Sequence, residues 1–126
     1  MSGEFWDYFF DINMDWGLIV YEQDWLSESD TTVPLVLNST SFGREWLLQM
    51  NNGAVTHNLC IQYCMSYTRN ILTTIELDGV TQARASDDYH PGNNQYRIGI
   101  SSILASSIDI APSKDSYWTK PITQTG

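Results

Sequence analysis

Four helical patterns alternate with four short apolar runs in this sequence, and the alternation constrains the fold more than any other feature. Apolar residues recur with helical spacing at 4–14, 42–55, 68–77 and 96–104. Apolar runs that are typical of buried strands follow at 18–21, 59–65, 80–85 and 108–111. Because a helix–strand order repeated in this way favours right-handed crossovers, it predicts a parallel sheet. We therefore expect an α/β domain with a parallel sheet of three to four strands and alternating helices, resembling half of a (β/α)8 barrel.

The remaining segments are predicted to connect or extend this domain. The stretch 26–41 is rich in Ser, Glu, Asp and Thr and contains Pro34, so we expect a loop there, with Ser39 and Ser41 as candidate helix caps. A length of 126 residues fits one hydrophobic core, which we assign to 1–118. The polar segment 119–126 is expected to be a flexible C-terminal tail.

The charge balance excludes several classes of partner. Six Lys and Arg stand against fifteen Asp and Glu, which gives a net charge of −9. A surface of this sign repels phosphate backbones and anionic lipids, so we expect neither nucleic acid nor a membrane as a partner. The N-terminal residues include no basic segment followed by an apolar one, so we see no export signal and expect a cytoplasmic protein. A fragment of a secreted protein would begin in the same way.

The cysteine and histidine residues point to neither a disulfide nor a metal site. Cys60 and Cys64, four positions apart on one strand, would lie ~13 Å from each other, which is too far for a disulfide. We expect free thiols that pack as small apolar groups. With His57 and His90 they match no ligand spacing, so we expect no metal and no cofactor.

Polar residues gather where three of the predicted strands end. The side-chain period of two puts Glu22 and Asp24 on one face of the first strand, and Gln62 and Cys64 on one face of the second. It likewise puts Arg84, Ser86 and Asp88 on one face of the third. Sites in parallel α/β folds lie at the carboxyl ends of strands, so these residues predict a functional site. The alternative is structural, with Arg84 forming a buried ion pair with Asp24 or Asp88.

The side chains at these strand ends suit chemistry on sugars. Glycoside hydrolysis needs two carboxylates, one that attacks or activates water and one that protonates the leaving oxygen. A neighbouring Arg can hold sugar hydroxyls and separate the pKa values of the two carboxyl groups. Trp25, Tyr89 and Trp118 would supply apolar walls for a sugar ring, although each aromatic side chain taken alone is also explained by packing.

Three segments resemble one enzyme group in order and spacing. Arg-Ala-Ser-Asp-Asp at 84–88, followed by Tyr89 and Pro91, is similar to the Arg-Ala-Ser-Asp-Asp-Phe-Tyr-Pro stretch of the raffinose synthase and alkaline α-galactosidase group. Val-Tyr-Glu-Gln-Asp at 20–24 resembles the strand ending in Lys-x-Asp that carries the nucleophile of that clan. Ile-Gln-Tyr-Cys-Met at 61–65 resembles the strand between them, which often ends in Cys-Met. The similarity extends over about 17–118.

The resemblance implies roles for individual residues. It makes Asp24 the nucleophile and Asp88, four residues after Arg84, the acid/base. It also makes Arg84 a ligand of sugar hydroxyls. Together with the strand-end and aromatic residues, the residues that we expect to bind substrate are Glu22, Trp25, Gln62, Cys64, Arg84, Ser86, Asp87, Tyr89, Asp115 and Trp118. Glu22 departs from the family, which has Lys two residues before the nucleophile, so a charge beside the reaction centre is reversed. The length departs too, because a whole barrel takes ~250 residues and only its middle and later strands are matched.

These observations leave three functional interpretations. The first is a carbohydrate-active domain that acts on or binds α-galactoside-like sugars through a pair of strand-end carboxylates. The second is a non-catalytic sugar-binding or assembly module that keeps the barrel-segment fold, and the third is a small α/β domain of unrelated function. The expected partners are a carbohydrate ligand and a second copy of the chain, because an open parallel sheet with two unpaired edges needs cover. Turnover of an aryl α-galactoside separates the first two interpretations.

Overall fold

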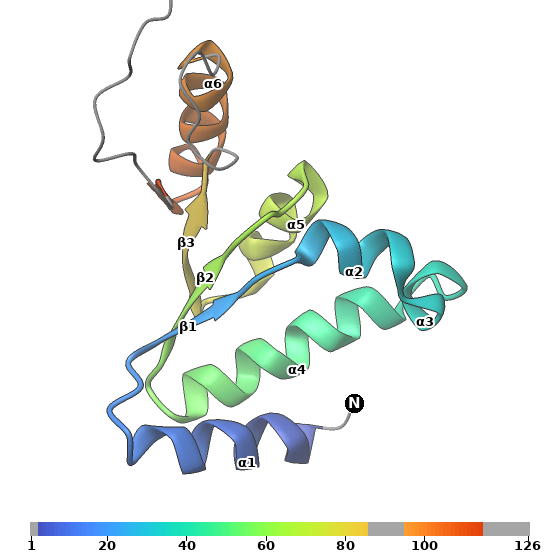
Figure 1. Ribbon diagram of the computed structural model, residues 1–126, viewed down its shortest axis with the longest axis vertical. Helices are drawn as coiled ribbons and strands as arrows, with labels where there is room; N and C mark the ends of the chain where they lie inside the picture. The colour runs from blue at the N-terminus through green and yellow to red at the C-terminus, as the bar shows by residue number, and fades with distance from the viewer. Residues whose placement is uncertain (1–2, 86–94, 115–126) are drawn as a thin grey trace, which may run out of the picture.

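The computed structural model describes residues 3–85 and 95–114 (Figure 1). In chain order its elements are α1 (Gly3–Met14), β1 (Val20–Gln23), α2 (Leu26–Thr32), α3 (Pro34–Leu37), α4 (Phe42–Thr56), β2 (Cys60–Tyr63), α5 (Thr68–Thr73), the 3₁₀ helix η1 (Thr74–Glu76), β3 (Val80–Arg84), α6 (Gln95–Ser106) and β4 (Ala111–Ser113). The predicted alternation of helices and strands is confirmed. The expected tail, 119–126, lies outside the described residues.

The four strands form one parallel sheet in the order β1-β2-β3-β4. Gln62 of β2 lies opposite Glu22 of β1 and Gln82 of β3, so these three side chains share a face. Successive strands always step in the same direction, and right-handed crossovers then place the connecting helices on one face of the sheet. The topology is that of half a (β/α)8 barrel, as the sequence predicts.

The hydrophobic core lies between the sheet and its helices. Ile61 and Tyr63 of β2 and Ala83 of β3 are at most 1% exposed. Met50 and Ala54 of α4, both 0% exposed, face them from the longest helix. We call this buried side of the sheet the helix face.

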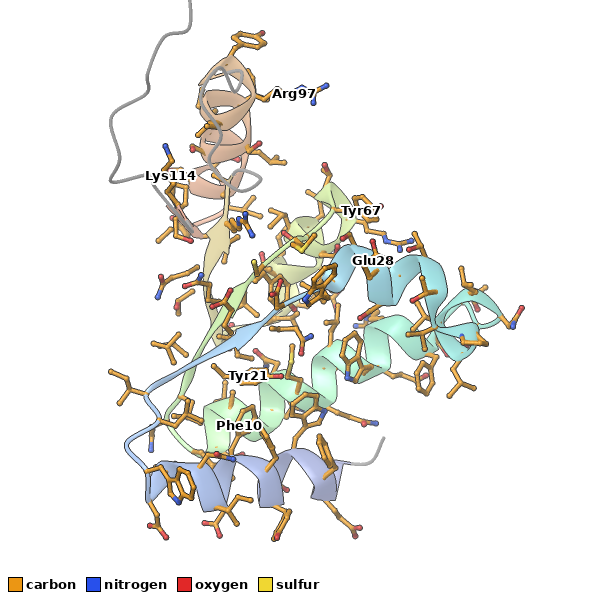
Figure 2. All side chains as sticks on the ribbon, viewed as in Figure 1. Phe10, Tyr21, Glu28, Tyr67, Arg97 and Lys114 are labelled. Atoms are coloured by element: carbon orange, nitrogen blue, oxygen red, sulfur yellow. The ribbon has the colours of Figure 1, made fainter. Side chains whose placement is uncertain are left out.

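An aromatic cluster joins α1 to the rest of the core. The rings of Phe10 and Tyr21, which point toward one another in Figure 2, have centroids 5.4 Å apart. Trp6 stacks on Phe10 at 5.6 Å. Gly53 of α4 allows this close approach, because a Cβ atom at that position would lie 2.9 Å from the Cβ atom of Trp6. Aromatic spacing in α1 therefore reflects packing on α4 and β1.

A buried polar residue connects α4 to the turn before β3. Asn51 is 6% exposed, and its Oδ1 atom accepts a hydrogen bond of 2.8 Å from the N–H of Gly79. This bond satisfies a buried backbone donor that would otherwise be left without a partner.

Two strands begin later than the sequence predicts. The first strand was expected at 18–21 and is found at Val20–Gln23, because the N–H of Leu18 still donates to the carbonyl of Asn13 as α1 ends. The last was expected at 108–111 and is found at Ala111–Ser113, since the N–H of Ile110 donates to Ala105 in the turn that ends α6. In both places the backbone of an apolar residue forms a hydrogen bond that closes the end of a helix, and strand pairing begins only after it.

The predicted loop at 26–41 is also wrong, because the short helices α2 and α3 occupy most of it. Leu26, at 0% exposed, is the one buried side chain of α2, so the segment has no apolar stripe to reveal a helix. Ser39, a predicted cap, accepts a hydrogen bond of 3.1 Å from the N–H of Phe42 at the start of α4. Among the described residues, no helix combines the length and apolar character required to cross a membrane.

Candidate functional site

The carboxyl ends of β1, β2 and β3 lie side by side, because the three strands are parallel neighbours. The register that sets Glu22 opposite Gln62 and Gln82 continues toward these ends. Asp24, Cys64 and Arg84 follow Glu22, Gln62 and Gln82 by two residues, so the period of two places them on the same face. We call this side, which is not packed against the helices, the open face.

Four side chains on the open face converge into what we call the strand-end cluster: Glu22, Asp24, Cys64 and Arg84. One oxygen from each carboxylate and the Sγ atom of Cys64 all lie within 4.8 Å of one another. Arg84 donates from a terminal nitrogen to the same Sγ atom at 3.2 Å. Cys64 is 1% exposed, whereas Glu22 and Asp24 are exposed. The buried thiol is therefore the centre of the cluster, and the two carboxylates form its solvent-facing edge.

The surroundings of Cys64 keep its thiol neutral. Burial raises the pKa of this thiol to about 12, and the hydrogen bonds to Asp24 and Glu22 act in the same direction. The guanidinium of Arg84 acts in the opposite direction, because it favours the thiolate. Since burial and the carboxylates dominate, the protonated thiol is a hydrogen-bond donor toward the carboxylates.

The carboxylate oxygens and the sulfur of this cluster are spaced closely enough to bind a metal ion, but a positively charged guanidinium lies beside the sulfur. Two carboxylates and a Cys sulfur can together bind a cation. A guanidinium 3.2 Å from the sulfur places a positive charge against the same ligand atom. We therefore assign the cluster to hydrogen bonding. The sequence analysis of metal ligands considered the spacing of Cys and His alone and so did not identify Glu22, Asp24 and Cys64 as a group. The parallel register places the two carboxylates beside Cys64.

The backbone is strained directly after β1 and β2. Trp25 has φ 60° and Met65 has φ 48°, in the left-handed region that bulky side chains rarely adopt. The N–H of Ser27 donates to the carbonyl of Met65 at 2.8 Å, and the N–H of Trp25 donates to Oδ1 of Asp24 at 2.7 Å. These bonds hold the two strand ends together and fix the position of the Asp24 carboxylate. Such strain is frequently found at binding and catalytic sites.

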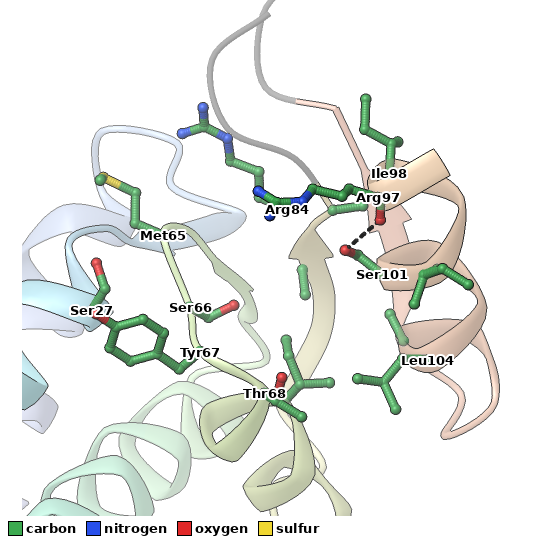
Figure 3. Close-up of a pocket in the computed structure, with 15 residues that line it drawn as sticks. Ser27, Met65, Ser66, Tyr67, Thr68, Arg84, Arg97, Ile98, Ser101 and Leu104 are labelled. Carbon is green, nitrogen blue, oxygen red and sulfur yellow. Dashed lines mark hydrogen bonds between the residues drawn. The ribbon is translucent and has the colours of Figure 1, made fainter. Parts of the chain in front are cut away.

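A cavity of about 600 Å³ adjoins the cluster at Arg84 (Figure 3). It lies between the end of β3, the segment from Met65 to the start of α5, and α6. Its polar lining is formed by Ser27, Ser66, Tyr67, Thr68, Arg84, Arg97 and Ser101, with an apolar part formed by Ile71, Ala83 and Leu104. The volume falls in the range of small-molecule sites. Figure 3 shows Arg84 and Arg97 on the same side of this cavity.

The predicted site residues divide into those that the structure describes and those that it does not. Glu22, Asp24, Cys64 and Arg84 are brought together, and Gln62 lies beside Glu22 in the strand register. Trp25, 57% exposed, follows Asp24 but does not line the cavity. The others lie outside the described residues: Ser86, Asp87, Asp88, Tyr89, Asp115 and Trp118. The role of Asp88 and its distance from Asp24 therefore stay predictions.

Apart from Arg84, the residues that line the cavity were not identified from the sequence. Ser66, Tyr67 and Thr68 come directly after the predicted second strand, so the rule that sites follow strand ends pointed to them. Arg97 and Ser101 belong to α6, and only the packing of that helix beside β4 places them at the cavity. The structural role considered for Arg84 was an ion pair with Asp24 or Asp88. Its guanidinium donates to Cys64 Sγ, and Asp88 lies outside the described residues, so that role stays a prediction.

Comparison with known proteins found no match to this chain among protein-family models, curated proteins or solved structures.

Proposed function

We propose that this chain is a carbohydrate-active domain of the α-galactosidase kind, with Asp24 as the attacking carboxylate. The observation that carries the proposal is the strand-end cluster, in which Glu22, Asp24, Cys64 and Arg84 meet at the carboxyl ends of parallel strands. Carboxylates beside a guanidinium suit a polyhydroxylated ligand, because the carboxylates accept hydrogen bonds from hydroxyls and the guanidinium donates to them.

The fixed position of Asp24 supports a role in the chemical step. Its Oδ1 atom accepts a hydrogen bond of 2.7 Å from the N–H of Trp25, and this bond does not engage the other carboxylate oxygen, Oδ2. A nucleophile held in this way loses less freedom when it attacks the anomeric carbon. In the retaining mechanism a second carboxyl group protonates the leaving oxygen, and this is the role proposed for Asp88.

The cavity beside Arg84 supports a small polar ligand. Hydroxyl groups of Ser66, Tyr67, Thr68 and Ser101 line a space of about 600 Å³, and Arg84 belongs to both the cavity and the cluster. A sugar bound there would meet hydroxyl donors and acceptors on one side and apolar side chains on the other. Apolar side chains with a few placed polar groups are typical of small-molecule sites.

Release of 4-nitrophenol from 4-nitrophenyl α-galactoside tests the proposal. Wild type is expected to release the phenol, and Asp24→Asn should lower the rate by roughly a thousandfold or more, the scale that follows removal of a residue acting in the chemical step. Glu28→Gln is the matched control, because Glu28 is an exposed carboxylate of α2 that belongs neither to the cluster nor to the cavity lining. Circular dichroism of each variant checks that the fold is kept.

Glu22 allows a sharper version of the same experiment. The resembled enzymes have Lys at this position, and here a second carboxylate lies in the cluster. Glu22→Lys should raise the rate of phenol release if Asp24 attacks, because it replaces the carboxylate beside Asp24 by the residue that the resembled enzymes have there. Glu22→Gln removes the negative charge without adding a positive one, and should give an intermediate rate.

The second candidate is a sugar-binding module without turnover, and the reversed charge at Glu22 favours it. Titration of the chain with methyl α-galactoside, followed by calorimetry, distinguishes the two. Binding without phenol release would support the module. If the chain neither binds methyl α-galactoside nor releases the phenol, both candidates are contradicted.

A further inference from the structure

The connection between β2 and α5, residues 65–68, forms one side of the cavity beside Arg84. Figure 3 shows Tyr67 of this connection and Ser101 and Leu104 of α6 on opposite sides of the cavity. A ligand in the cavity would therefore lie between the connection and α6. How firmly the connection is held in place then decides how well such a ligand is oriented.

Tyr67 is the only aromatic residue in the described lining of the cavity. It is 48% exposed, so a ligand can reach its ring. The guanidinium carbon of Arg69 lies over the ring, 5.8 Å from the ring centroid. The guanidinium therefore covers one face of the ring and leaves the remainder for contact with a ligand. A sugar ring has apolar C–H groups that can pack on an aromatic surface of this kind.

A carboxylate from another helix holds Arg69 over the ring. The Nε atom of Arg69 donates a hydrogen bond of 2.7 Å to Oδ2 of Asp30, a residue of α2. The side chain of Asp30 is 10% exposed, whereas that of Arg69 is 59% exposed. A carboxylate buried to this extent costs free energy unless it is paired and hydrogen-bonded. The position of the Asp30 carboxylate is thus fixed, and it restricts that of the Arg69 guanidinium.

Asp30 also reaches the backbone of Tyr67, through Asn70. The Nδ2 atom of Asn70 donates to Oδ2 of Asp30 at 2.9 Å, and its Oδ1 atom accepts a hydrogen bond of 2.7 Å from the N–H of Tyr67. Asn70 is 3% exposed, so these bonds are shielded from water. Asp30 therefore restrains the ring of Tyr67 through Arg69 and its backbone through Asn70.

A second bond from α2 holds the other end of the connection. The N–H of Ser27 donates to the carbonyl of Met65 at 2.8 Å, at a residue whose φ of 48° is in the left-handed region. Leu26 is the buried side chain of α2, so apolar packing of this helix is limited. Polar bonds at Ser27 and Asp30 thus attach α2 to both ends of the cavity wall.

We propose that Asp30 is a positioning residue of the ligand site, and that the sugar ring packs on Tyr67, which Asp30 holds in place. This inference rests on the proposed function, because it takes a sugar as the ligand of the cavity. It adds a binding residue and its support to that function, and gives neither a part in the hydrolytic step. A purely structural Asp30 would join α2 to α5 without affecting the ligand, and binding measurements distinguish the two roles.

Titration calorimetry with methyl α-galactoside tests the contact with Tyr67. Tyr67→Ala removes the ring and should weaken binding by about three- to tenfold. Tyr67→Phe keeps the ring and should bind nearly as tightly as wild type. The matched control is Glu76→Gln, which removes the carboxylate that pairs with Arg44 outside the cavity lining and should leave binding unchanged.

Asp30→Asn tests the positioning role, because it removes the charge that pairs with Arg69 and keeps the size of the side chain. It should weaken sugar binding by up to the loss seen for Tyr67→Ala. With 4-nitrophenyl α-galactoside it should raise KM and leave kcat nearly unchanged, because Asp24 stays in place. In a Tyr67→Ala background Asp30→Asn should have no further effect on binding, since no ring is left to position.

Circular dichroism and thermal unfolding check that each variant is folded. A structural and a positioning role both lower the melting temperature of Asp30→Asn, so the binding data and KM decide between them. Arg69→Gln removes the same ion pair by changing an exposed side chain, and it makes the same test if Asp30→Asn does not fold.

The results that overturn this inference differ from those that overturn the proposed function. If wild type binds methyl α-galactoside and Tyr67→Ala binds it equally well, the inference is wrong and the proposed function stands. If Asp30→Asn weakens binding equally with and without the Tyr67 ring, Asp30 does not act through Tyr67. If Asp30→Asn lowers the melting temperature alone, its role is structural. If wild type neither binds the sugar nor releases the phenol, the proposed function fails and the inference fails with it.

Discussion

The two faces of the sheet are built from alternate residues of the same strands, yet they differ in nearly every property. On β2, Ile61 and Tyr63 are fully buried against the helices, while Gln62 between them lies on the open face and is half-buried. On β3, Ala83 is 1% exposed and its neighbour Arg84 reaches the strand-end cluster. The helix face thus stabilises the domain, and the open face carries the polar groups that can meet a ligand.

This difference follows from how much each face is desolvated. Removing buried apolar atoms costs their transfer free energy and leaves a cavity, whereas a polar side chain in contact with water contributes little to stability. The comparison predicts that mutations one residue apart have very different effects.

The largest expected effect is on the helix face. Ile61→Ala should lower the free energy of unfolding by about 2–5 kcal/mol, because it removes fully buried methyl groups between β2 and α4. Gln62→Ala, the adjacent residue on the open face, should change it by about 0.5 kcal/mol or less. Urea denaturation followed by circular dichroism measures both. Equal losses for the two variants would contradict the division into faces.

A smaller effect is expected where a polar residue is buried on the helix side. Asn51→Leu should lower the free energy of unfolding by about 1–3 kcal/mol, because the N–H of Gly79 loses its acceptor in a buried position. Asn52→Leu, at the exposed next position, is the control and should be nearly neutral. The same urea series measures this pair. If Asn51→Leu were neutral, burial of polar groups would not be what distinguishes the helix face.

The smallest effect concerns the pH dependence of stability, and it tests the one buried group of the cluster. The pKa of Cys64 is raised to about 12 in the folded chain. A thiol in the unfolded chain ionises at lower pH, so the unfolded state loses its proton first and stability falls as the pH rises from the usual thiol pKa toward about 12. Cys64→Ala should make the fall between neutral and mildly alkaline pH shallower.

Thermal unfolding of wild type and Cys64→Ala across this pH range provides the measurement. Tyr21 and Tyr63 also have raised pKa values through burial, and they add to the alkaline fall in both proteins equally. The difference between the two curves therefore isolates Cys64. Parallel curves would show that the Cys64 thiol ionises alike in the folded and unfolded states.

Periodic patterns made much of the fold predictable. The helix expected at 42–55 is found at Phe42–Thr56, since a long stripe of apolar residues marks its buried side. α2 was not predicted because its only buried side chain is Leu26, and a single buried residue gives no helical periodicity of apolar residues in the sequence. The strand displacements at Val20 and Ala111 come from hydrogen bonds that close helix ends, which the apolar pattern does not encode.

Part of the candidate site was predictable for the same reason. The side-chain period of two is enough to assign Glu22 and Asp24 to one face of β1, and Gln62 and Cys64 to one face of β2. That Cys64 is the centre of the cluster depends on the 3.2 Å contact with Arg84 and on burial, neither of which is a property of spacing. The cavity beside Arg84 depends on where α6 packs.

The sequence by itself determined the class of fold, the direction of the strands and the face on which each strand residue lies, because these follow from local period and from the handedness of crossovers. Only the tertiary structure decided which of those residues meet. Contacts between strands far apart in the chain depend on register, and the register between β2 and β3 shifts between Ile61 and Gln62. A shift of one residue there would turn Arg84 away from Cys64, so the cluster exists through packing that no single segment specifies.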